Sequence, residues 1–365
     1  MKSFASCFSE LPDPRAPNAL HDLREVLFIA LLATLCGATH CTDMALFART
    51  KAYLLTPILT LKHGLPSHDT FSRVFRMLDP QAFERSFQRF MKAFAKAARI
   101  EPAQGVVAVD GKALRRGYER GKAHMPPVMV TLWAAQTRMA LANTLAPGNN
   151  EALGAQQLIE LIQLKGCVVT ADALHCHRTM AKAITDRGGD YVLAVKENQP
   201  ALLADAKAAI VAATRRGAKR LATAEFNHGR AEKRSAVIAK VGEMGQKHDF
   251  PGLKAVACIT SKRAKDDTVK RYFLMSQPYS RTQVLRIVRQ HWGIENCLHW
   301  PLDVVLDEDL ARNRKDNAPA NLAILKRLAL NVARAHPDTK ISLRAKLKRA
   351  GWDDTFLFDM ISHMR

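Results

Sequence analysis

The sequence VVAVDGK at residues 106–112 decides the fold, because four apolar residues run directly into Asp110. Short apolar runs rich in valine predict a strand that is buried on both faces. The sequence CVVTAD at residues 167–172 repeats the pattern and ends in Asp172. Open α/β sheets place their ligand sites at the carboxyl ends of parallel strands, so we expect Asp110 and Asp172 to meet at one edge of a sheet.

Asp110 and Asp172, as neighbours, would form a site for a divalent cation. Carboxylates held close together repel each other, and a bound cation relieves that repulsion. Mg²⁺ typically takes one or two protein carboxylates and fills its other positions with water and substrate phosphates. Each aspartate also has a structural interpretation, since Asp110 and Gly111 can form a turn and Asp172 can cap a following helix. The recurrence of the strand-then-aspartate pattern favours the metal site.

A third acid, Glu295, lies in the run HWGIEN near the end of an expected helix. Ser280, followed three residues later by Gln283, predicts a capping box that starts this helix. Glu295 falls on the same helical side as Val288 and Trp292. Packing of those apolar residues against the core would hold the carboxylate at the rim of the site, as a preorganised ligand must be held.

The helix that carries Glu295 permits two other interpretations. His291, Glu295 and His299 are four residues apart and share one face, which suggests a zinc site. We discount zinc, because such sites usually have a further ligand and the helix should kink at Pro301. Most glutamates on helices simply face solvent, and this interpretation of Glu295 stays open.

Other acids compete with Glu295 for the third place. Glu197 is the strongest rival, because it follows an expected strand that ends at Val195. Residues 198–200 (NQP) predict a turn into the next helix, where an acid more often caps or is solvated than binds metal. A last set of acids lies beyond the break at Pro301, where no continuous helix fixes their direction: Asp303, Asp307, Glu308 and Asp309.

The remaining pattern predicts an α/β core between two helical regions. Residues 21–99 favour helices, including a buried one over the apolar run 26–38, which is too short to cross a bilayer. Strand patterns after Pro102 and an alternating, antiparallel stretch between residues 222 and 275 complete the core. The expected strands are 106–109, 128–134, 139–145, 167–171, 191–195, 235–241, 254–259 and 271–275, with helices at 151–164 and 178–187.

Charge points to nucleic acid as the partner. The chain carries 55 Lys and Arg against 34 Asp and Glu, a formal net charge of +21, and such a surface attracts polyanions. Residues 64–76 (GLPSHDTFSRVFR) predict a helix capped by Ser67 or Asp69, with Arg73 and Arg76 outward, which fits either DNA contact or plain packing. Seven cysteines without a Cys-x-x-Cys pair argue against a disulfide framework and suit a reducing cytoplasm. We see no secretion signal or membrane anchor.

Taken in order, these motifs resemble the insertion-sequence transposases of the H-repeat-associated (ISAs) type, within the DDE transposases. The resemblance covers nearly the whole chain, and so many short matches in order are far more specific than any one alone. The matching segments are Asp13 to Arg15 with His21, 64–76 (GLPSHDTFSRVFR), 78–80 (LDP), 109–114 (VDGKAL), Asn150 with Glu151, 170–176 (TADALHC), 190–199 (DYVLAVKENQ), 228–230 (HGR), 291–296 (HWGIEN), 302–304 (LDV), Glu308 with Asp309, and 317–331.

The resemblance implies a ribonuclease-H-like core with a β-rich insertion, preceded by an all-helical N-terminal domain and followed by C-terminal helices. We expect a helical domain with possible DNA-end contact at 1–100, a catalytic domain at 101–335 with its insertion at about 200–278, and a basic helical tail at 336–365. The family's catalytic acids fall on Asp110, Asp172 and Glu295. These would bind two Mg²⁺ or Mn²⁺ ions about 4 Å apart and act on element ends and target DNA.

Further expectations concern assembly and place in the cell. The resemblance implies a homodimer when the protein is assembled on DNA. The expected location is the cytoplasm, with nucleoid association in the DNA-bound state.

The sequence departs from the family at a few positions. Glu197 replaces a usually small residue, His177 replaces a frequent Gln, and His291 stands where the broader group has Arg. Positive charge at the cleaved phosphate must then come from other side chains. The expected DNA-binding residues are Lys112, Arg115, Lys196, Arg230, His291, Arg312 and Arg314.

Two alternatives remain beside a transposase. A metal-dependent nuclease on the same core would share the acids and the charge but cut without joining. A DNA-binding relic of a transposase would keep the fold and lack the chemistry, although all three acids are present here. Strand-transfer products separate these alternatives.

Overall fold

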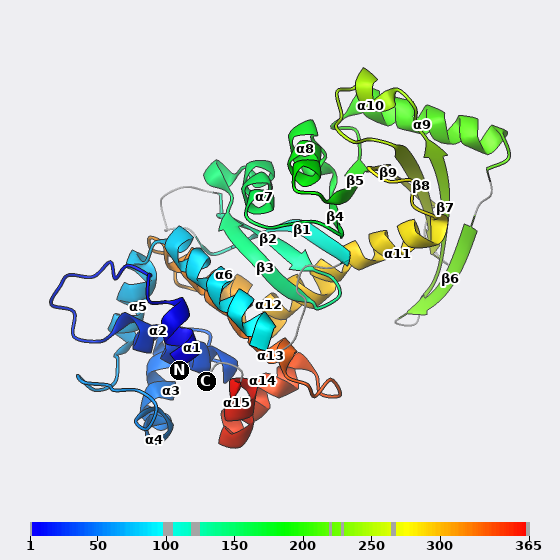
Figure 1. The fold of residues 1–365 in the computed structure, drawn as a ribbon. Coiled ribbons are helices and arrows are strands. Elements are labelled where there is room, and N and C mark those ends of the chain that lie inside the picture. Colours follow the sequence, from blue (N-terminus) through cyan, green and yellow to red (C-terminus); the bar gives the residue numbers. More distant parts are fainter. Residues whose placement is uncertain are drawn as a thin grey trace.

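A single mixed sheet with helices on both faces organises the protein (Figure 1). The structure is a computed structural model and describes residues 2–97, 105–117, 125–218, 221–227, 230–263 and 268–362. Nine strands lie in the order β3-β2-β1-β4-β5-β9-β8-β7-β6. They are β1 (Gly105–Ala113), β2 (Val128–Ala134), β3 (Met139–Leu145), β4 (Cys167–Ala171), β5 (Asp190–Val195), β6 (Leu221–Asn227), β7 (Arg230–Lys240), β8 (Ala255–Arg263) and β9 (Val269–Met275).

Strand β1 lies in the interior of the sheet, where it has an antiparallel neighbour on one side and a parallel neighbour on the other. It is antiparallel to β2, and β2 is antiparallel to β3, whereas β1, β4 and β5 are parallel. The α/β core and the parallel pairing of the strands that precede Asp110 and Asp172 are therefore confirmed. β1 continues past Asp110, and Gly111 pairs with Val130 of β2. The alternative in which Asp110 and Gly111 form a turn is therefore wrong.

The antiparallel stretch extends this sheet. β9 pairs antiparallel with β5, and β8, β7 and β6 follow, each antiparallel to its neighbour. Helix α9 (Pro200–Arg215) lies on one face of β7 to β9, and α11 (Arg281–His291) packs on the opposite face (Figure 1). The short helix α10 (Met244–Lys247) connects β7 to β8.

Two groups of helices cover the two faces of the central strands. α7 (Glu151–Glu160) and α8 (Arg178–Asp186) lie on one face, where Leu158 and Ile184 belong to a core with Val107 and Val169. α6 (Pro80–Ala97) and α13 (Ala318–Ala335) lie on the other face (Figure 1). The short 3₁₀ turns are η1 (Pro147–Asn149), η2 (Ala173–His175) and η4 (Glu308–Leu310).

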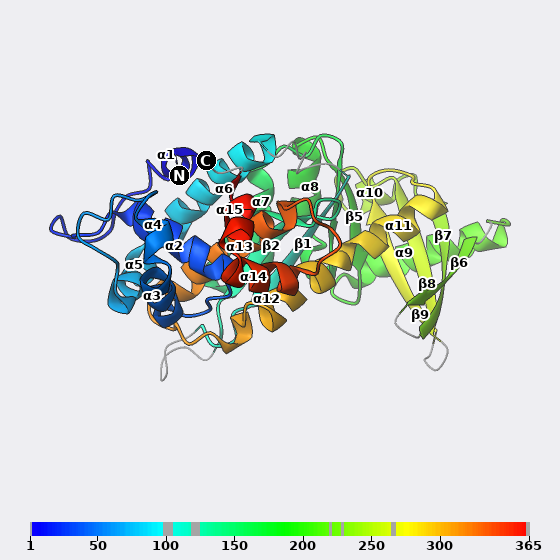
Figure 2. The ribbon, with the colours of Figure 1, turned by 90° about the horizontal axis from the view of Figure 1, so that it is seen from below.

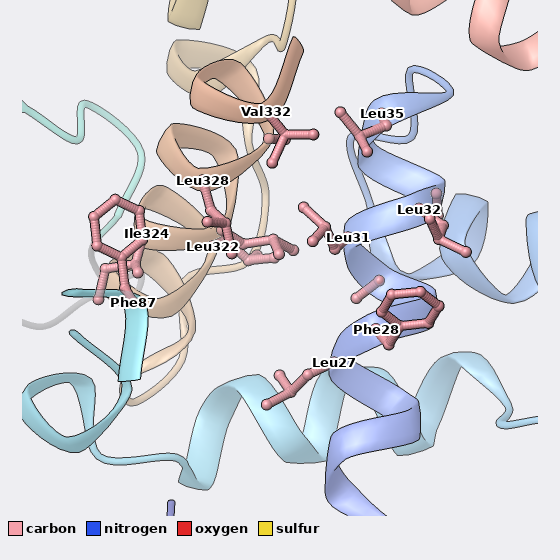
Figure 3. Close-up of a cluster of buried hydrophobic side chains, with 14 of the residues drawn as sticks. Leu27, Phe28, Leu31, Leu32, Leu35, Phe87, Leu322, Ile324, Leu328 and Val332 are labelled. Atoms are coloured by element: carbon pink, nitrogen blue, oxygen red, sulfur yellow. The ribbon is translucent and has the colours of Figure 1, made fainter. Parts of the chain in front are cut away.

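The N-terminal and C-terminal helices share one apolar core. α2 (Leu23–Leu35) is buried almost throughout, as its apolar run predicts, and packs against α13, while Phe87 of α6 lies on the other side of α13 (Figure 3). In that view Leu31 and Leu35 of α2 face Leu328 and Val332 of α13. α14 (Leu343–Trp352) and α15 (Asp354–Met360) complete this core, and the two chain ends lie close together (Figure 2). The other N-terminal helices are α1 (Lys2–Cys7), α3 (Cys41–Thr50), α4 (Ala52–Leu55) and α5 (His68–Met77).

The two predicted helix starts are confirmed. The Ser67 side chain caps α5 by accepting the N–H of Thr70, and Ser280 and Gln283 form a capping box at the start of α11. These caps fix where α5 and α11 begin, because they satisfy N–H groups that lack partners in the first turn of a helix. Within the described residues no helix combines the length and apolar character needed to cross a membrane.

Candidate active site

Asp110 and Asp172 lie at neighbouring positions on parallel strands. The last paired residues of β1 and β4 are Val109 and Ala171, so the two aspartates follow side by side at the same edge. Asp110 is four-fifths buried, whereas about half of the Asp172 side chain is exposed. Burial is the main cause that raises the pKa of Asp110, and the two carboxylates lie close enough for the charge of Asp172 to add to it.

Asp172 also has the structural role that its sequence context suggests. Its Oδ1 atom accepts the N–H of Leu174 at 2.9 Å and caps the 3₁₀ turn η2. This bond fixes one carboxylate oxygen and orients the group. A carboxylate has two oxygens with about four lone-pair positions, so capping and metal binding are compatible in Asp172.

Glu295 is carried by a widened helical turn. α11 ends at His291, and a π-helical turn, η3 (Glu295–His299), leads into α12 (Trp300–Val304). The Trp300 N–H donates to the carbonyl of Glu295, five residues earlier. Pro301 follows directly, and a proline ring conflicts with the carbonyl four residues before it, so a π turn lets the helix continue. The kink that the sequence predicts at Pro301 therefore takes the form of a π turn just before it. Pro301 itself lies in the first turn of α12.

The packing that holds Glu295 differs from the expected one. Val288 is buried as expected, but Trp292 is 43% exposed. Ile294 and Leu298, which flank the glutamate, are buried instead. At Gly293 a Cβ atom would lie 2.8 Å from the Trp133 ring, so this glycine lets the helix approach the sheet. The buried side chains of Ile294 and Leu298 therefore anchor the turn that carries Glu295, while Trp292 faces outward.

Glu295, His299 and Asp110 converge on one point. The Nδ1 atom of His299 lies 3.3 Å from Glu295 Oε2 and 3.6 Å from Asp110 Oδ2. One potential ligand atom from each residue falls within 4.8 Å of the others, a spacing that suits a metal ion. The sequence suggests His299 only as a zinc ligand on the face of His291 and gives no sign of its contact with Asp110. Sequence spacing cannot show this contact, because it joins segments nearly 190 positions apart.

The carboxylates of Asp110, Asp172 and Glu295 lie close together, and their mutual repulsion disfavours a state in which all three are ionised. Burial, then the charges of Glu295 and Asp172, raises the pKa of Asp110 to about 8. The pKa of Glu295 is lowered, first by its hydrogen bond with His299. One proton is thus retained on Asp110 next to an ionised Glu295. A divalent cation would take the place of that proton.

Glu151 and His175 lie beside the two aspartates and were not predicted as site residues. The Nε2 atom of His175 is 4.0 Å from Glu151 Oε2 and 3.9 Å from Asp172 Oδ1. Burial and the charge of Asp172 raise the pKa of Glu151. In the sequence, Glu151 only follows a helix cap, and His175 lies in an ordinary turn, so neither gives a local signal.

A cavity of about 190 Å³ opens next to the acids. Its polar lining includes Asp110, Asp172, Glu295, Lys196 and Arg271, and its apolar wall comes from β5, β9 and α11. Arg271 lies over the Trp292 ring at 5.8 Å from the ring centre. The cavity therefore places two basic side chains in front of the carboxylates. Lys196 is one of the expected DNA-binding residues, and Arg271 is not.

One expected DNA-binding residue, Lys112, is buried, and another, His291, is half-buried. Lys112 is 7% exposed, and its Nζ lies 2.7 Å from Asp303 and 2.8 Å from Asp309. Its charge is neutralised inside the protein, which disfavours a contact between Lys112 and DNA. Desolvation lowers the pKa of His291 to about 4, and its Nδ1 lies 3.1 Å from Thr170 Oγ1. A neutral imidazole supplies no positive charge to a phosphate, which disfavours an ionic contact between His291 and DNA.

The other expected cations are distributed over the surface. Lys196 is exposed, and Arg115 is exposed while it pairs with Asp309. Arg312 and Arg314 line a groove of about 460 Å³ together with Arg76 of α5. The groove thus brings α5, the helix whose sequence fits either DNA contact or packing, next to the basic segment that contains Arg312 and Arg314. Arg230 begins β7, but its side chain lies outside the described residues.

The rival acids do not approach the cluster in the described part of the chain. Glu197 is exposed and is absent from the lining of the cavity. Asp303, Glu308 and Asp309 surround Lys112. These positions favour Glu295 as the third acid.

Known proteins resemble this chain over most of its length. A family model described as a transposase DDE domain matches residues 101–332, and one described as DDE_Tnp_1-associated matches residues 5–91. The chain is 38% identical to the "Uncharacterized protein in dhlA 3'region" of Xanthobacter autotrophicus, over 74% of this chain and 92% of that protein. It is 26% identical to the "H repeat-associated putative transposase YhhI" of Escherichia coli K12, over 99% and 98% of the two chains.

A solved structure matches the chain at low similarity. It is described as "Cryo-EM structure of piggyBac transposase synaptic complex with hairpin DNA (SNHP)". The match has a TM-score of 0.46 and 12% sequence identity, and it covers 100% of this chain and 77% of that one.

Proposed function

Because the chain belongs to the DDE transposase family, we propose that Asp110, Asp172 and Glu295 are the acids at which it cleaves and joins DNA. The protein is an insertion-sequence transposase, an enzyme of phosphoryl transfer, and the family depends on divalent metal ions. The observation that carries the assignment is the convergence of Asp110, Glu295 and His299 within 4.8 Å, beside Asp172.

The residues present fit a divalent cation. Carboxylate oxygens from β1, β4 and the π turn form the donor set that Mg²⁺ and Mn²⁺ prefer. Burial, then the charges of Glu295 and Asp172, raises the pKa of Asp110, and a cation would remove the repulsion among these carboxylates. We propose two ions, which when bound supply an activated nucleophile and stabilise the leaving oxygen.

Side chains around the acids have separate tasks in this proposal. His299 holds the Glu295 carboxylate against Asp110, as hydrogen-bonded partners orient metal ligands in other proteins. Lys196 and Arg271 line the cavity and can hold the negative charge of the phosphate that is attacked. Arg115 and the groove of Arg312 and Arg314 can grip the DNA backbone farther out.

The fold assignment is also part of the proposal. We interpret β1 to β5 as a ribonuclease-H-like core, which is supported by their order, β3-β2-β1-β4-β5, with β1, β4 and β5 parallel. The proposed domains are 1–100, 101–335 with an insertion at about 200–278, and 336–365. A homodimer on DNA, element ends and target DNA as substrates, and nucleoid association in the bound state complete the proposal.

A strand-transfer assay tests the function. The full chain, Mg²⁺ and a duplex that ends in the inverted repeat flanking the gene should give cleaved ends and joined products. Asp110→Ala should lose both products and keep DNA binding, because it removes a ligand and leaves the basic surface intact. Mg²⁺-dependent cleavage retained in Asp110→Ala would remove this residue from the site.

A further inference from the structure

We propose that Glu151 is a fourth carboxylate ligand, which joins Asp110 and Asp172 in holding a second divalent cation apart from the Asp110, Glu295 and His299 group. The inference rests on the proposed function, because it assumes that the edge of β1 and β4 binds metal. It adds to that function a residue on a different helix and face.

Gly111 gives the Glu151 carboxylate access to the acids. Glu151 is the first residue of α7, and the Asn150 side chain caps that helix by accepting the N–H of Leu153. A Cβ atom on Gly111 would lie 2.3 Å from Glu151 Oε2. Any other residue at 111 would therefore displace the carboxylate. Glu151 thus lies against the backbone of β1 one residue after Asp110.

Asp110 lies between two groups of acids. His299, which contacts Glu295, lies 3.6 Å from Asp110 Oδ2, and Glu151 lies against Gly111, the residue that follows Asp110. Glu295 approaches with His299 from the π turn, whereas Glu151 approaches from α7. Two separate sets of ligands therefore share Asp110, as expected when one carboxylate bridges two cations.

His175 provides an independent sign of a ligand at this place. Its side chain is completely buried, and neither ring nitrogen has a hydrogen-bond partner among the described residues. Nε2 points between Glu151 Oε2 at 4.0 Å and Asp172 Oδ1 at 3.9 Å. A buried polar group without a partner is costly, and such groups call for an explanation such as a bound ion or water.

Ordinary surface pairing does not account for Glu151. Within the described ranges no lysine or arginine forms an ion pair with it, and its side chain is only 25% exposed. A glutamate in the first turn of a helix is favoured by the helix dipole, but that effect does not require it to turn toward other acids. A cation between Glu151, Asp172 and Asp110 would satisfy all three carboxylates. The unpartnered Nε2 atom of His175 faces the two outer ones, at 4.0 Å from Glu151 Oε2 and 3.9 Å from Asp172 Oδ1.

Mn²⁺ binding to the full-length protein tests the inference without any activity measurement. Electron paramagnetic resonance counts free and bound Mn²⁺ during a titration. We expect two ions for the wild type and for Glu160→Gln, a matched change at the exposed far end of α7. Glu151→Gln should bind one ion as in the wild type and the other at least tenfold more weakly. Circular dichroism confirms that each variant is folded.

A second variant keeps every acid and moves only the carboxylate. Gly111→Ala should displace Glu151 and weaken one of the two ions by a similar factor, with the other ion retained. Two ions bound with wild-type affinity in both Glu151→Gln and Gly111→Ala would overturn the inference. Glu295→Gln separates the role of Glu151 from the proposed function. If Glu295→Gln loses an ion while Glu151→Gln and Gly111→Ala do not, only the role of Glu151 is overturned. Wild-type binding in Glu295→Gln and Asp110→Asn would instead overturn the proposed function.

Discussion

The Nζ atom of Lys112 lies 2.7 Å from the Oδ1 atom of Asp303 and thereby ties β1 to α12. The same ammonium contacts Asp309, and Glu308 lies 3.7 Å away. Glu308 in turn accepts a hydrogen bond from the fully buried Arg327 of α13. This buried network joins the strand of Asp110 to the helix that follows Glu295, so it fixes two of the three proposed catalytic acids relative to each other.

Lys112→Gln should therefore lower stability and leave DNA contacts unchanged. Removing one partner from a buried ion pair typically costs about 3–5 kcal/mol, because the remaining charges lose their compensation. Urea unfolding measures this loss. The salt dependence of DNA affinity should keep its slope in Lys112→Gln. Lys196→Gln is the control, because loss of one exposed phosphate contact should reduce that slope by about 1. A reduced slope in Lys112→Gln would show that the lysine does reach DNA.

DNA affinity should depend steeply on salt. The net charge of +21 and the groove of Arg312 and Arg314 predict many phosphate contacts. Six to ten such contacts lower affinity by roughly 10³ to 10⁵ between 50 and 200 mM salt. Arg314→Gln should reduce the slope of log affinity against log salt by about 1. A flat response of the wild type in a fluorescence anisotropy titration would refute the phosphate-dominated account.

Glu84 should make stability depend on pH. It is buried on α6, accepts the N–H of Asn143 at 2.8 Å, and burial raises its pKa to about 8. The folded state then holds an extra proton between about pH 4.5 and 8. The free energy of unfolding should therefore fall as pH rises through this window, by up to about 1.4 kcal/mol per pH unit. Glu84→Gln should remove this contribution, which Glu160→Gln should retain; equal slopes in all three proteins would contradict it.

Short apolar runs made much of the sheet predictable. The predicted ranges 128–134, 139–145 and 167–171 coincide with β2, β3 and β4. Each run is valine-rich or alternating and is bounded by residues that end strands, so local sequence determines its limits. The same holds for the Ser280 cap, whose two reciprocal bonds depend on residues only three positions apart.

Long-range burial limited what could be predicted about the site. Lys112 follows Asp110 in an apparently exposed basic motif, and only the fold brings Asp303 and Asp309 around it. The π turn at Glu295 depends on Pro301 together with the packing of Ile294, which no periodicity reveals. The Glu151 carboxylate reaches the site because Gly111 has no side chain in its way, and this contact joins distant segments of the chain. Sequence patterns thus identify the acids more readily than the groups that position them.

The choice between Glu295 and Glu197 tests the central claim most directly. Glu295→Gln keeps the shape of the side chain and removes the charge that lies beside Asp110 and His299. Glu197→Gln is its matched control, since that exposed glutamate follows β5 and does not line the cavity. Cleavage and strand transfer should be measured for both variants with Mg²⁺ and with Mn²⁺. We predict that Glu295→Gln folds, binds DNA and forms neither product, whereas Glu197→Gln retains activity; the reverse pattern would contradict the assignment of the third acid.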